Sequence, residues 1–293
     1  EATYNVVLHN NMKPVLVDIG WDLNINTEEI EKAITKKTRA VMPVHLLGRP
    51  GEMPAILKIA KKHKLKVIED SCEAVMMDGI GTGDVTCFSF YVAHLLVTGV
   101  GGMAITNNEK LARLIRSLIF HGRDDKYLKI EDDDNLKGKK LKEVIDARFR
   151  FNYPGYSDRG TEVEAALGLV ELETLKDKIA RRRKIAAFLG EGLYIEDGQF
   201  DWFSDYYQNH AFMLFPYFSA QRDKLMLYME KHGITTRTLM PLLNQPYIKK
   251  NKQGYFKRSE WLLDTGLLFG CHQDLTKKDL EYIVRTIKDF END

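Results

Sequence analysis

The sequence predicts an α/β protein that combines a mostly parallel sheet with crossover helices and a smaller C-terminal α+β domain. In the first half, short runs rich in β-branched residues alternate with amphipathic stretches, which is typical of parallel strands joined by helices. After Leu193 the pattern changes to separate strands and helices. We therefore predict a large domain over residues 1–190 and a small domain over residues 191–293.

The elements of the first half follow from these runs in chain order. Five strands are predicted, at Pro14–Asp18, Ala40–Val44, Lys66–Asp70, Phe88–Tyr91 and Gly102–Thr106. Three helices are predicted between them, at Thr27–Ile34, Met53–Lys64 and Asn108–Phe120. Thr27 is expected to cap the first of these helices, with Ile30, Ala33 and Ile34 facing inward.

The second half begins with a highly charged segment, Gly122–Asp146, which the sequence predicts to be a mobile, solvated loop rather than a binding lid. A long helix over Thr161–Leu193 then connects the two domains. The small domain is predicted to contain a strand at His210–Phe215. Its helices are expected near Arg222–His232 and Lys277–Asp289.

Composition limits the kinds of partner. The 43 Lys and Arg side chains balance 42 Asp and Glu among 293 residues, so neither nucleic acid nor an acidic membrane surface is an expected partner. The three cysteines, Cys72, Cys87 and Cys271, are too few and too scattered for a disulfide scaffold or a four-thiolate metal site. With no apolar run of about 20 residues and no leader pattern, the chain is predicted to be cytoplasmic.

A few polar residues follow the predicted strands, where open α/β sheets place their ligands. Asp70 ends a buried strand and Ser89 lies five residues before His94, in front of the glycine turn Gly99–Gly102. Taken singly, each has an ordinary explanation: a strand-terminal Asp is usually a cap or ion-pair partner, and a lone His is usually structural. Their order along the chain is more informative than any one of them.

Five segments, in order, resemble one family. They are Val44–Pro50 (VHLLGRP), Val67–Ala74 (VIEDSCEA), Gly83–Phe90 (GDVTCFSF), Gly99–Gly102 (GVGG) and His121-Gly122. Further agreement comes from Pro154–Arg159, Glu164–Gly168 and Gly233–Arg237. The whole chain resembles the DegT/DnrJ/EryC1/StrS group of pyridoxal-phosphate-type sugar enzymes, which have the aspartate-aminotransferase fold.

The resemblance implies a role for each matching position. Asp70 corresponds to the partner of the cofactor's pyridine nitrogen, Glu73 lies where a glutamine usually stands beside the ring, and Ser89 contacts the cofactor phosphate. Ser157 takes the place of an Asn that helps to bind phosphate across a dimer interface. The positions implied for the substrate are Arg159, Arg237 and His272.

His94 occupies the position of the lysine that holds the aldehyde cofactor as a Schiff base. An imidazole cannot form that bond, although it can move a proton. The 3-dehydratase branch of the family also has a histidine there. Glu69–Glu73 (EDSCE) and Phe269–Gln273 (FGCHQ) resemble that branch as well. The cysteine group that would follow His121-Gly122 in an iron–sulfur relative is absent, so no cluster is predicted.

The resemblance implies noncovalent pyridoxamine 5'-phosphate, alternating with pyridoxal 5'-phosphate, as the cofactor. The substrate is a nucleotide-linked 4-keto-6-deoxy sugar that loses its C3 hydroxyl, with His94 as the acid/base and L-glutamate as the amino donor. The unperturbed pKa of histidine, about 6.5, suits proton transfer near neutral pH. A homodimer is expected from the same resemblance.

Two departures keep alternatives open. Val100 replaces a usual Glu, and residue 1 aligns partway into the catalytic domain, so the upstream helices, a phosphate turn and a ring-stacking aromatic are expected to have no counterpart in this chain. A pyridoxal-phosphate-dependent sugar aminotransferase is the second hypothesis, against which His94 argues directly. A noncatalytic truncated homologue is the third.

Overall fold

The computed structural model describes residues 1–126, 128, 130–193, 208–239, 241–249 and 254–292. Its first sheet has the order β1-β2-β3-β4, formed by Ala40–Val41, Lys66–Asp70, Val85–Ser89 and Gly102–Ile105. The pairs β1-β2 and β2-β3 are parallel, whereas β4 runs antiparallel to β3. This mostly parallel α/β sheet confirms the predicted fold class.

The helices around this sheet are the three predicted from amphipathic stretches and an N-terminal helix that was not predicted. They are α1 (Ala2–His9), α2 (Thr27–Ala33), α3 (Met53–His63) and α4 (Glu109–Ile119). The turn η1 (Leu46–Gly48) and α3 connect β1 to β2, and α3 buries Ile56 and Ala60 against Val41 and Val67. The chain between β2 and β3 contains no helix, so the two parallel strands are joined by a loop.

Two predictions near the N-terminus are wrong. Pro14–Asp18 forms no strand, because its backbone has no ladder partner: the one bridge nearby joins Ile19 to Ile25. The cap of α2 is Asn26 rather than Thr27, since the Asn26 side chain accepts a hydrogen bond from the Glu28 N–H group. Ile30 is buried as predicted.

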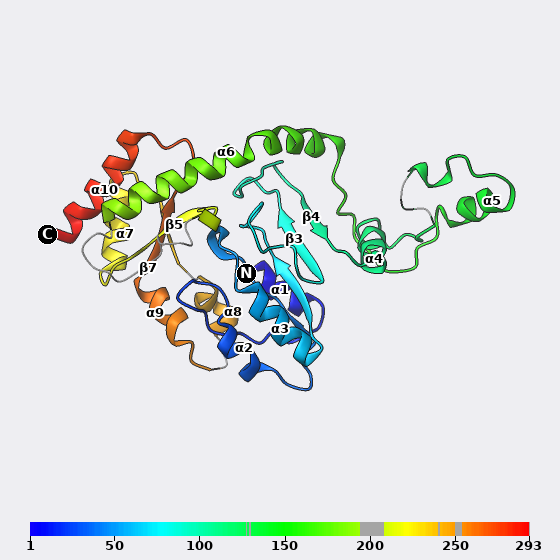
Figure 1. The fold of residues 1–293 in the computed structure, drawn as a ribbon, viewed down its shortest axis with the longest axis horizontal. Coiled ribbons are helices and arrows are strands. Elements are labelled where there is room, and N and C mark those ends of the chain that lie inside the picture. Colours follow the sequence, from blue (N-terminus) through cyan, green and yellow to red (C-terminus); the bar gives the residue numbers. More distant parts are fainter. Residues whose placement is uncertain (127, 129, 194–207, 240, 250–253, 293) are drawn as a thin grey trace.

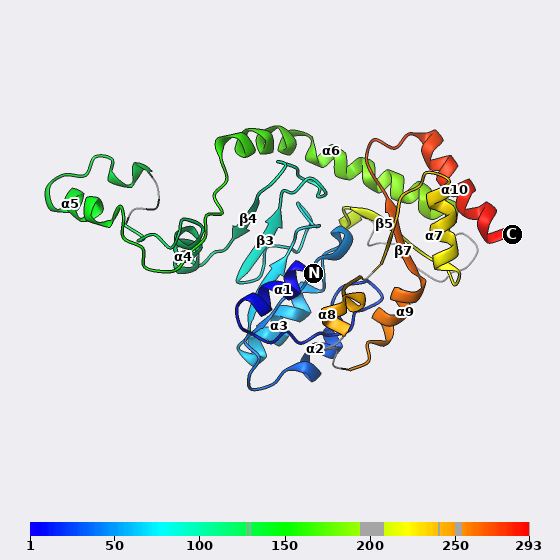
Figure 2. The same cartoon turned by 180° about the vertical axis from the view of Figure 1, so that it is seen from behind.

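The charged segment after α4 is an arm that projects away from both sheets (Figures 1 and 2). It was predicted to be a solvated loop, but it contains η2 (Ile130–Asp133) and α5 (Gly138–Ala147). Val144 and Ala147 of α5 are buried, and the backbone of Asp124 pairs with that of Arg150. The few apolar residues of this segment gather on one side of α5, which stabilises a helix where charge alone suggests none.

The long helix α6 (Glu162–Leu193) extends from the first sheet to the second and confirms the predicted connecting helix (Figure 1). The second sheet has the order β5-β7-β6, formed by Leu214–Phe218, Gly266–Gly270 and Thr236–Thr238. In the described residues around it lie α7 (Arg222–Lys231), η4 (Pro241–Asn244), α8 (Pro246–Lys249), α9 (Lys257–Thr265) and α10 (Lys277–Asn292). The strand predicted at His210–Phe215 begins only at Leu214.

The main core lies between α6 and the second sheet. Ile185 and Leu189 of α6 pack with Phe215, Phe269 and Ile287. A second cluster joins N-terminal residues to the C-terminal part, for example Leu23 and Leu47 to Leu262. The predicted division at residue 190 thus falls inside α6, and it stays a prediction because residues 194–207, which follow it, lie outside the described residues.

Candidate active site

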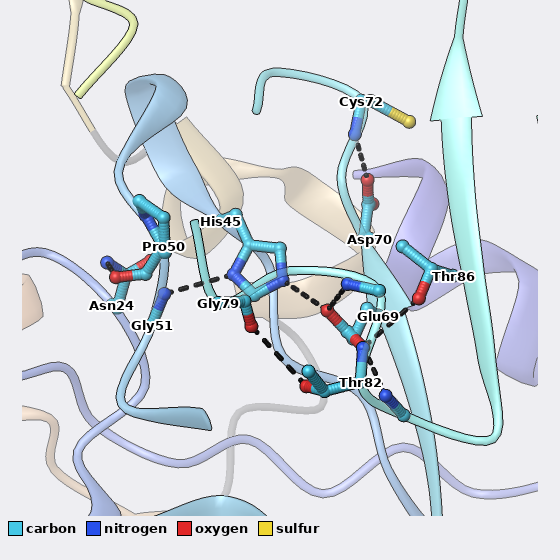
Figure 3. Close-up of polar contacts among 12 residues, drawn as sticks. Asn24, His45, Pro50, Gly51, Glu69, Asp70, Cys72, Gly79, Thr82 and Thr86 are labelled. Carbon is cyan, nitrogen blue, oxygen red and sulfur yellow. Dashed lines mark hydrogen bonds and ion pairs between the residues drawn. The ribbon is translucent and has the colours of Figure 1, made fainter. Parts of the chain in front are cut away.

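Asp70 stands at the carboxyl end of β2, between β1 and β3. Its backbone is fixed on both sides, because its N–H group donates to Pro43 O at 2.9 Å and its carbonyl accepts from the His45 N–H group at 3.0 Å. One carboxylate oxygen accepts from the Cys72 N–H group at 3.1 Å (Figure 3) and the other accepts from the Thr3 hydroxyl at 2.5 Å. Asp70 is therefore a well-oriented anion at the sheet edge where α/β proteins bind ligands.

Glu73 follows in the loop after β2. Its Oε2 accepts from the backbone N–H group of Leu47 at 2.5 Å, and Leu47 has a φ of 58°, in the left-handed region. Burial raises the pKa of Glu73, and the negative charge of Asp70 adds to this effect, whereas the Leu47 hydrogen bond opposes it. The structure thus places two carboxyl groups close enough to interact, and Glu73 holds its proton more tightly than an exposed glutamate does.

Ser89 and His94 come from the end of β3 and the turn after it. The His94 Nδ1 lies 2.8 Å from the Ser89 Oγ, which also accepts from the Tyr91 N–H group at 3.3 Å. Burial lowers the pKa of His94, while the Asp70 charge opposes that shift. Burial therefore favours the neutral form of the His94 imidazole, whose Nδ1 is engaged by Ser89.

His94 lines a cavity of about 380 Å³ between its own turn, α6 and the segment after β7. His272 lines the same cavity, and its Nδ1 lies 3.3 Å from a carboxylate oxygen of Asp274. Polar side chains of α6 complete the wall: Glu171, Lys178 and Arg182. The structure thus brings His272 to His94, although 178 positions separate them in the chain.

The other three predicted residues lie elsewhere in this chain. Ser157 forms a backbone bridge with Phe120 at the end of α4, and the Arg159 guanidinium lies 5.0 Å from the centre of the Phe120 ring. Arg237 is exposed on β6. None of the three lines the His94 cavity, so their predicted contacts with phosphate and substrate stay predictions.

The sequence interpretation missed a buried pair behind Asp70. Glu69 and His45 have no exposed side-chain surface, and the His45 Nε2 lies 3.0 Å from Glu69 (Figure 3). Because the His45 Nδ1 accepts from the Gly51 N–H group, the proton of this imidazole is on Nε2 and is donated to Glu69. The burial pattern of β2 carries the signal: Glu69 has the inward position next to Val67, where a carboxylate must be hydrogen-bonded.

Glu69 also holds the loop between β2 and β3. It accepts hydrogen bonds from the backbone of Gly81, Thr82 and Gly83 and from the Thr86 hydroxyl. Burial opposes ionisation of Glu69, but the hydrogen bonds from His45 and the loop outweigh it and lower the pKa. This ionised carboxylate fixes the strand end that carries Asp70.

The model of the DegT/DnrJ/EryC1/StrS aminotransferase family matches residues 1–288. The chain belongs to this family. The predicted family is therefore confirmed, with the match extending over both sheets.

Relatives within the DegT/DnrJ/EryC1/StrS family differ in activity. An uncharacterised protein of Methanocaldococcus jannaschii is 33% identical over 98% of this chain and 76% of its own length. The dTDP-4-dehydro-2,6-dideoxy-D-glucose 3-dehydratase of Saccharopolyspora spinosa is 29% identical over 99% of this chain and 67% of its own. The crystal structure of NtdA from Bacillus subtilis, with bound cofactor PMP, has a TM-score of 0.82 and 25% identity, covering 100% of this chain and 66% of that one.

Among the residues that the structure describes, no group of three or more His, Cys, Asp or Glu side chains is arranged to hold a metal ion. In the same part of the chain, no helix has both the length and the apolar character needed to cross a bilayer.

Proposed function

We propose that this chain is a pyridoxamine-phosphate-dependent 3-dehydratase, which removes the C3 hydroxyl of a nucleotide-linked 4-keto-6-deoxy sugar. One observation carries the proposal: the residue in the family's lysine position is His94, held by Ser89 at 2.8 Å and opening into the cavity. Its imidazole can transfer protons but cannot hold the cofactor covalently.

The residues at the strand ends fit this cofactor. The Asp70 carboxylate suits a protonated ring nitrogen, and the partly buried Glu73 carboxyl suits a polar group on the ring edge. The Ser71 hydroxyl between them is buried and has no hydrogen-bond partner among the described residues, so this end of the sheet has unused hydrogen-bonding capacity. When bound, the cofactor supplies an amine that condenses with the C4 ketone and a ring that accepts electrons. Ser89 and Ser157 are the proposed phosphate contacts.

His94 performs the proton transfers in this proposal. Burial favours the neutral form. In this role Nε2 takes a proton from the cofactor carbon that carries the amine, which requires the tautomer whose Nδ1–H group donates to Ser89 across the 2.8 Å contact. The resulting imidazolium gives that proton to the C3 oxygen, which leaves as water. Asp70 balances the positive charge on the cofactor ring and, through its negative charge, also favours the imidazolium.

We propose Arg159, Arg237 and His272 as substrate contacts, L-glutamate as the amino donor, and the cytoplasm as the location. A second copy of the chain is proposed to cover the exposed apolar side chains of the first half of α6 (Val163, Leu167, Leu169, Val170 and Leu172). The name of the S. spinosa relative, a 3-dehydratase of a nucleotide-linked keto sugar, supports the reaction class.

A sugar aminotransferase is the second candidate, because the family is described by that activity. The two are separated by incubating the protein with pyridoxamine phosphate, glutamate and a nucleotide-linked 4-keto-6-deoxy sugar, followed by mass spectrometry of the sugar. The 3-dehydratase yields a 3-deoxy-4-keto product. An amino sugar as the main product, or a cofactor attached covalently after borohydride reduction, overturns the proposal.

A further inference from the structure

The cavity beside His94 contains an excess of positive charge. Its ionised lining residues are Glu171, Lys178 and Arg182, which all lie on α6. Their spacing of seven and then four residues places them along one side of the helix. With neutral histidines, these three side chains leave one positive charge facing the cavity.

Arg182 is the source of this excess. Its side chain is 6% exposed, and burial lowers the pKa of the guanidinium. Nε donates to the Gln273 side chain and Nη1 donates to the carbonyls of Phe212, Met213 and Cys271. These partners are uncharged, and no carboxylate forms an ion pair with Arg182 among the described residues. The Asp274 carboxylate favours the charged guanidinium from a distance but makes no ion pair with it. Because a buried cation is costly unless it is closely paired, an anion that enters the cavity is stabilised.

Lys178 is the second cation of the cavity, and its ion pair with Glu171 limits how strongly it attracts an entering anion. Its ammonium lies 2.8 Å from both carboxylate oxygens of Glu171, and the two side chains are 25% and 24% exposed. Lys178 also stands one helical turn from Arg182, where like charges repel. Glu171 therefore neutralises Lys178 in the free protein and competes with any anion that approaches it.

We propose that Arg182 and Lys178 form a carboxylate-binding subsite for the amino donor, with Glu171 as the competing internal anion. The inference rests on the proposed function, which requires such a donor. An amino acid carries its carboxylate on the carbon next to its amine, so an anchor for it must share a cavity with the proton-transfer residue, as Arg182 does with His94. The diphosphate of a nucleotide sugar is joined at C1, across the ring from C4, and belongs farther away.

The test uses glutarate, which has two carboxylates and no reactive amine or ketone, and isothermal titration calorimetry on the cofactor-loaded protein. We expect Lys178→Gln to weaken glutarate binding roughly 5–10-fold and Glu171→Gln to strengthen it roughly 3-fold, as expected for one ion pair of this exposure. The matched control is Lys142→Gln on α5, whose Lys142–Asp146 pair is exposed and lies outside the cavity. It should leave binding unchanged.

Three outcomes overturn the subsite: no glutarate binding to the unmodified protein, equal effects of Lys178→Gln and Lys142→Gln, or the same direction of change for Lys178→Gln and Glu171→Gln. The other possible source of the anion is the diphosphate of the nucleotide sugar, and titration with GDP tests it. If Lys178→Gln weakens the binding of GDP but not of glutarate, the subsite belongs to a diphosphate. A single turnover of the keto sugar by the unmodified protein loaded with pyridoxamine phosphate needs no amino donor. Its failure rejects the proposed function, whereas the glutarate titration rejects only the subsite.

Discussion

His94 is the residue whose replacement separates the two chemistries most sharply. We expect His94→Asn to lower dehydration by about 10²–10⁴-fold, the usual contribution of a positioned acid/base, because Asn can keep a hydrogen bond to Ser89 but cannot transfer a proton. Product formation is measured by mass spectrometry in a single turnover. His63→Asn, at a surface ion pair with Glu31, is the control and should react normally. A fully active His94→Asn protein would assign proton transfer to another group.

The protonation of His94 gives a second prediction at this scale. Burial lowers its pKa and the Asp70 charge opposes that change, so Asp70→Asn should lower the His94 pKa further. The imidazole loses its proton as pH rises through the pKa, and the titration curve of the variant should therefore move to lower pH. NMR titration of the His94 ring proton measures the shift, with His63 as the internal reference. An unchanged or higher His94 pKa would contradict the predicted influence of Asp70.

Some residues of the site can be predicted from the sequence and others cannot. Asp70, Glu73, Ser89 and His94 lie in two short segments at strand ends, where local pattern and resemblance both point to them. His272 comes next to His94 only through the packing of the second sheet against α6. Glu69 was not predicted as a buried residue, because a carboxylate in a strand is expected to face solvent when only its hydropathy is considered. The alternation of buried and exposed positions along β2 places Glu69 inside, on the same face as Val67.

At the scale of elements, the Glu69–His45 pair links β2 to two loops. Glu69→Ala removes a buried carboxylate and leaves several donors without their partner, including the imidazole of His45 and the Gly81 and Thr82 N–H groups. We expect the free energy of unfolding to fall by about 3 kcal/mol or more. Urea unfolding measures the change. Glu109→Ala, at an exposed pair on α4, should alter it by less than about 0.5 kcal/mol.

The N-terminal cap of α2 should contribute less to stability than the Glu69–His45 pair does. Asn26→Ala removes the side-chain acceptor of the Glu28 N–H group and should cost about 1 kcal/mol of stability. Thr27→Ala should cost less, because Thr27 is already inside the helix. Urea unfolding of the two variants decides between the observed cap and the one predicted from the capping-box pattern. A larger loss for Thr27→Ala would favour the sequence pattern.

Elements with strong periodicity were predictable, and those that depend on distant partners were not. The helix α3 and the strand β2 agree with their predicted ranges to within one residue because each has a continuous apolar stripe or run. Pro14–Asp18 looks equally apolar, but a strand needs a neighbour to bond to, and none is present at that place. In α5 two buried apolar residues outweigh the charge around them.

At the scale of the whole molecule, Asp18 links the N-terminal part of the chain to the C-terminal part. One carboxylate oxygen accepts from the Ser259 hydroxyl at 2.6 Å and from the Ser259 N–H group at 3.0 Å, and the other accepts from the Arg258 N–H group at 3.0 Å. This contact spans 241 positions and ties the segment before α2 to α9. Burial opposes ionisation, but the bonds from Ser259, Arg258 and Ile19 outweigh it and lower the pKa of Asp18.

The sign of the pH dependence follows from that lowered pKa. Asp18 binds its proton more tightly in the unfolded chain, so its contribution to stability is complete above the unfolded pKa of about 3.9 and disappears as pH falls through the folded value. Asp18→Asn should therefore reduce the free energy of unfolding by about 1–3 kcal/mol at pH 7, as expected for lost hydrogen bonds to a charged group. The difference from the unmodified protein should shrink below pH 4. Urea unfolding at both pH values measures it.

The matched control for Asp18 is Asp264→Asn, because Asp264 is an exposed carboxylate on the same helix, α9. It should change stability by less than about 0.5 kcal/mol at either pH. A pH-independent loss for Asp18→Asn would show that the side chain acts by shape and hydrogen bonding rather than by its charge. Since the segment tied down by Asp18 packs Ile19 and Leu23 against Leu47, whose N–H group holds Glu73, the same variant should also weaken pyridoxamine phosphate binding at pH 7. Fluorescence titration with the cofactor, compared with Asp264→Asn, decides whether this distant contact supports the active site.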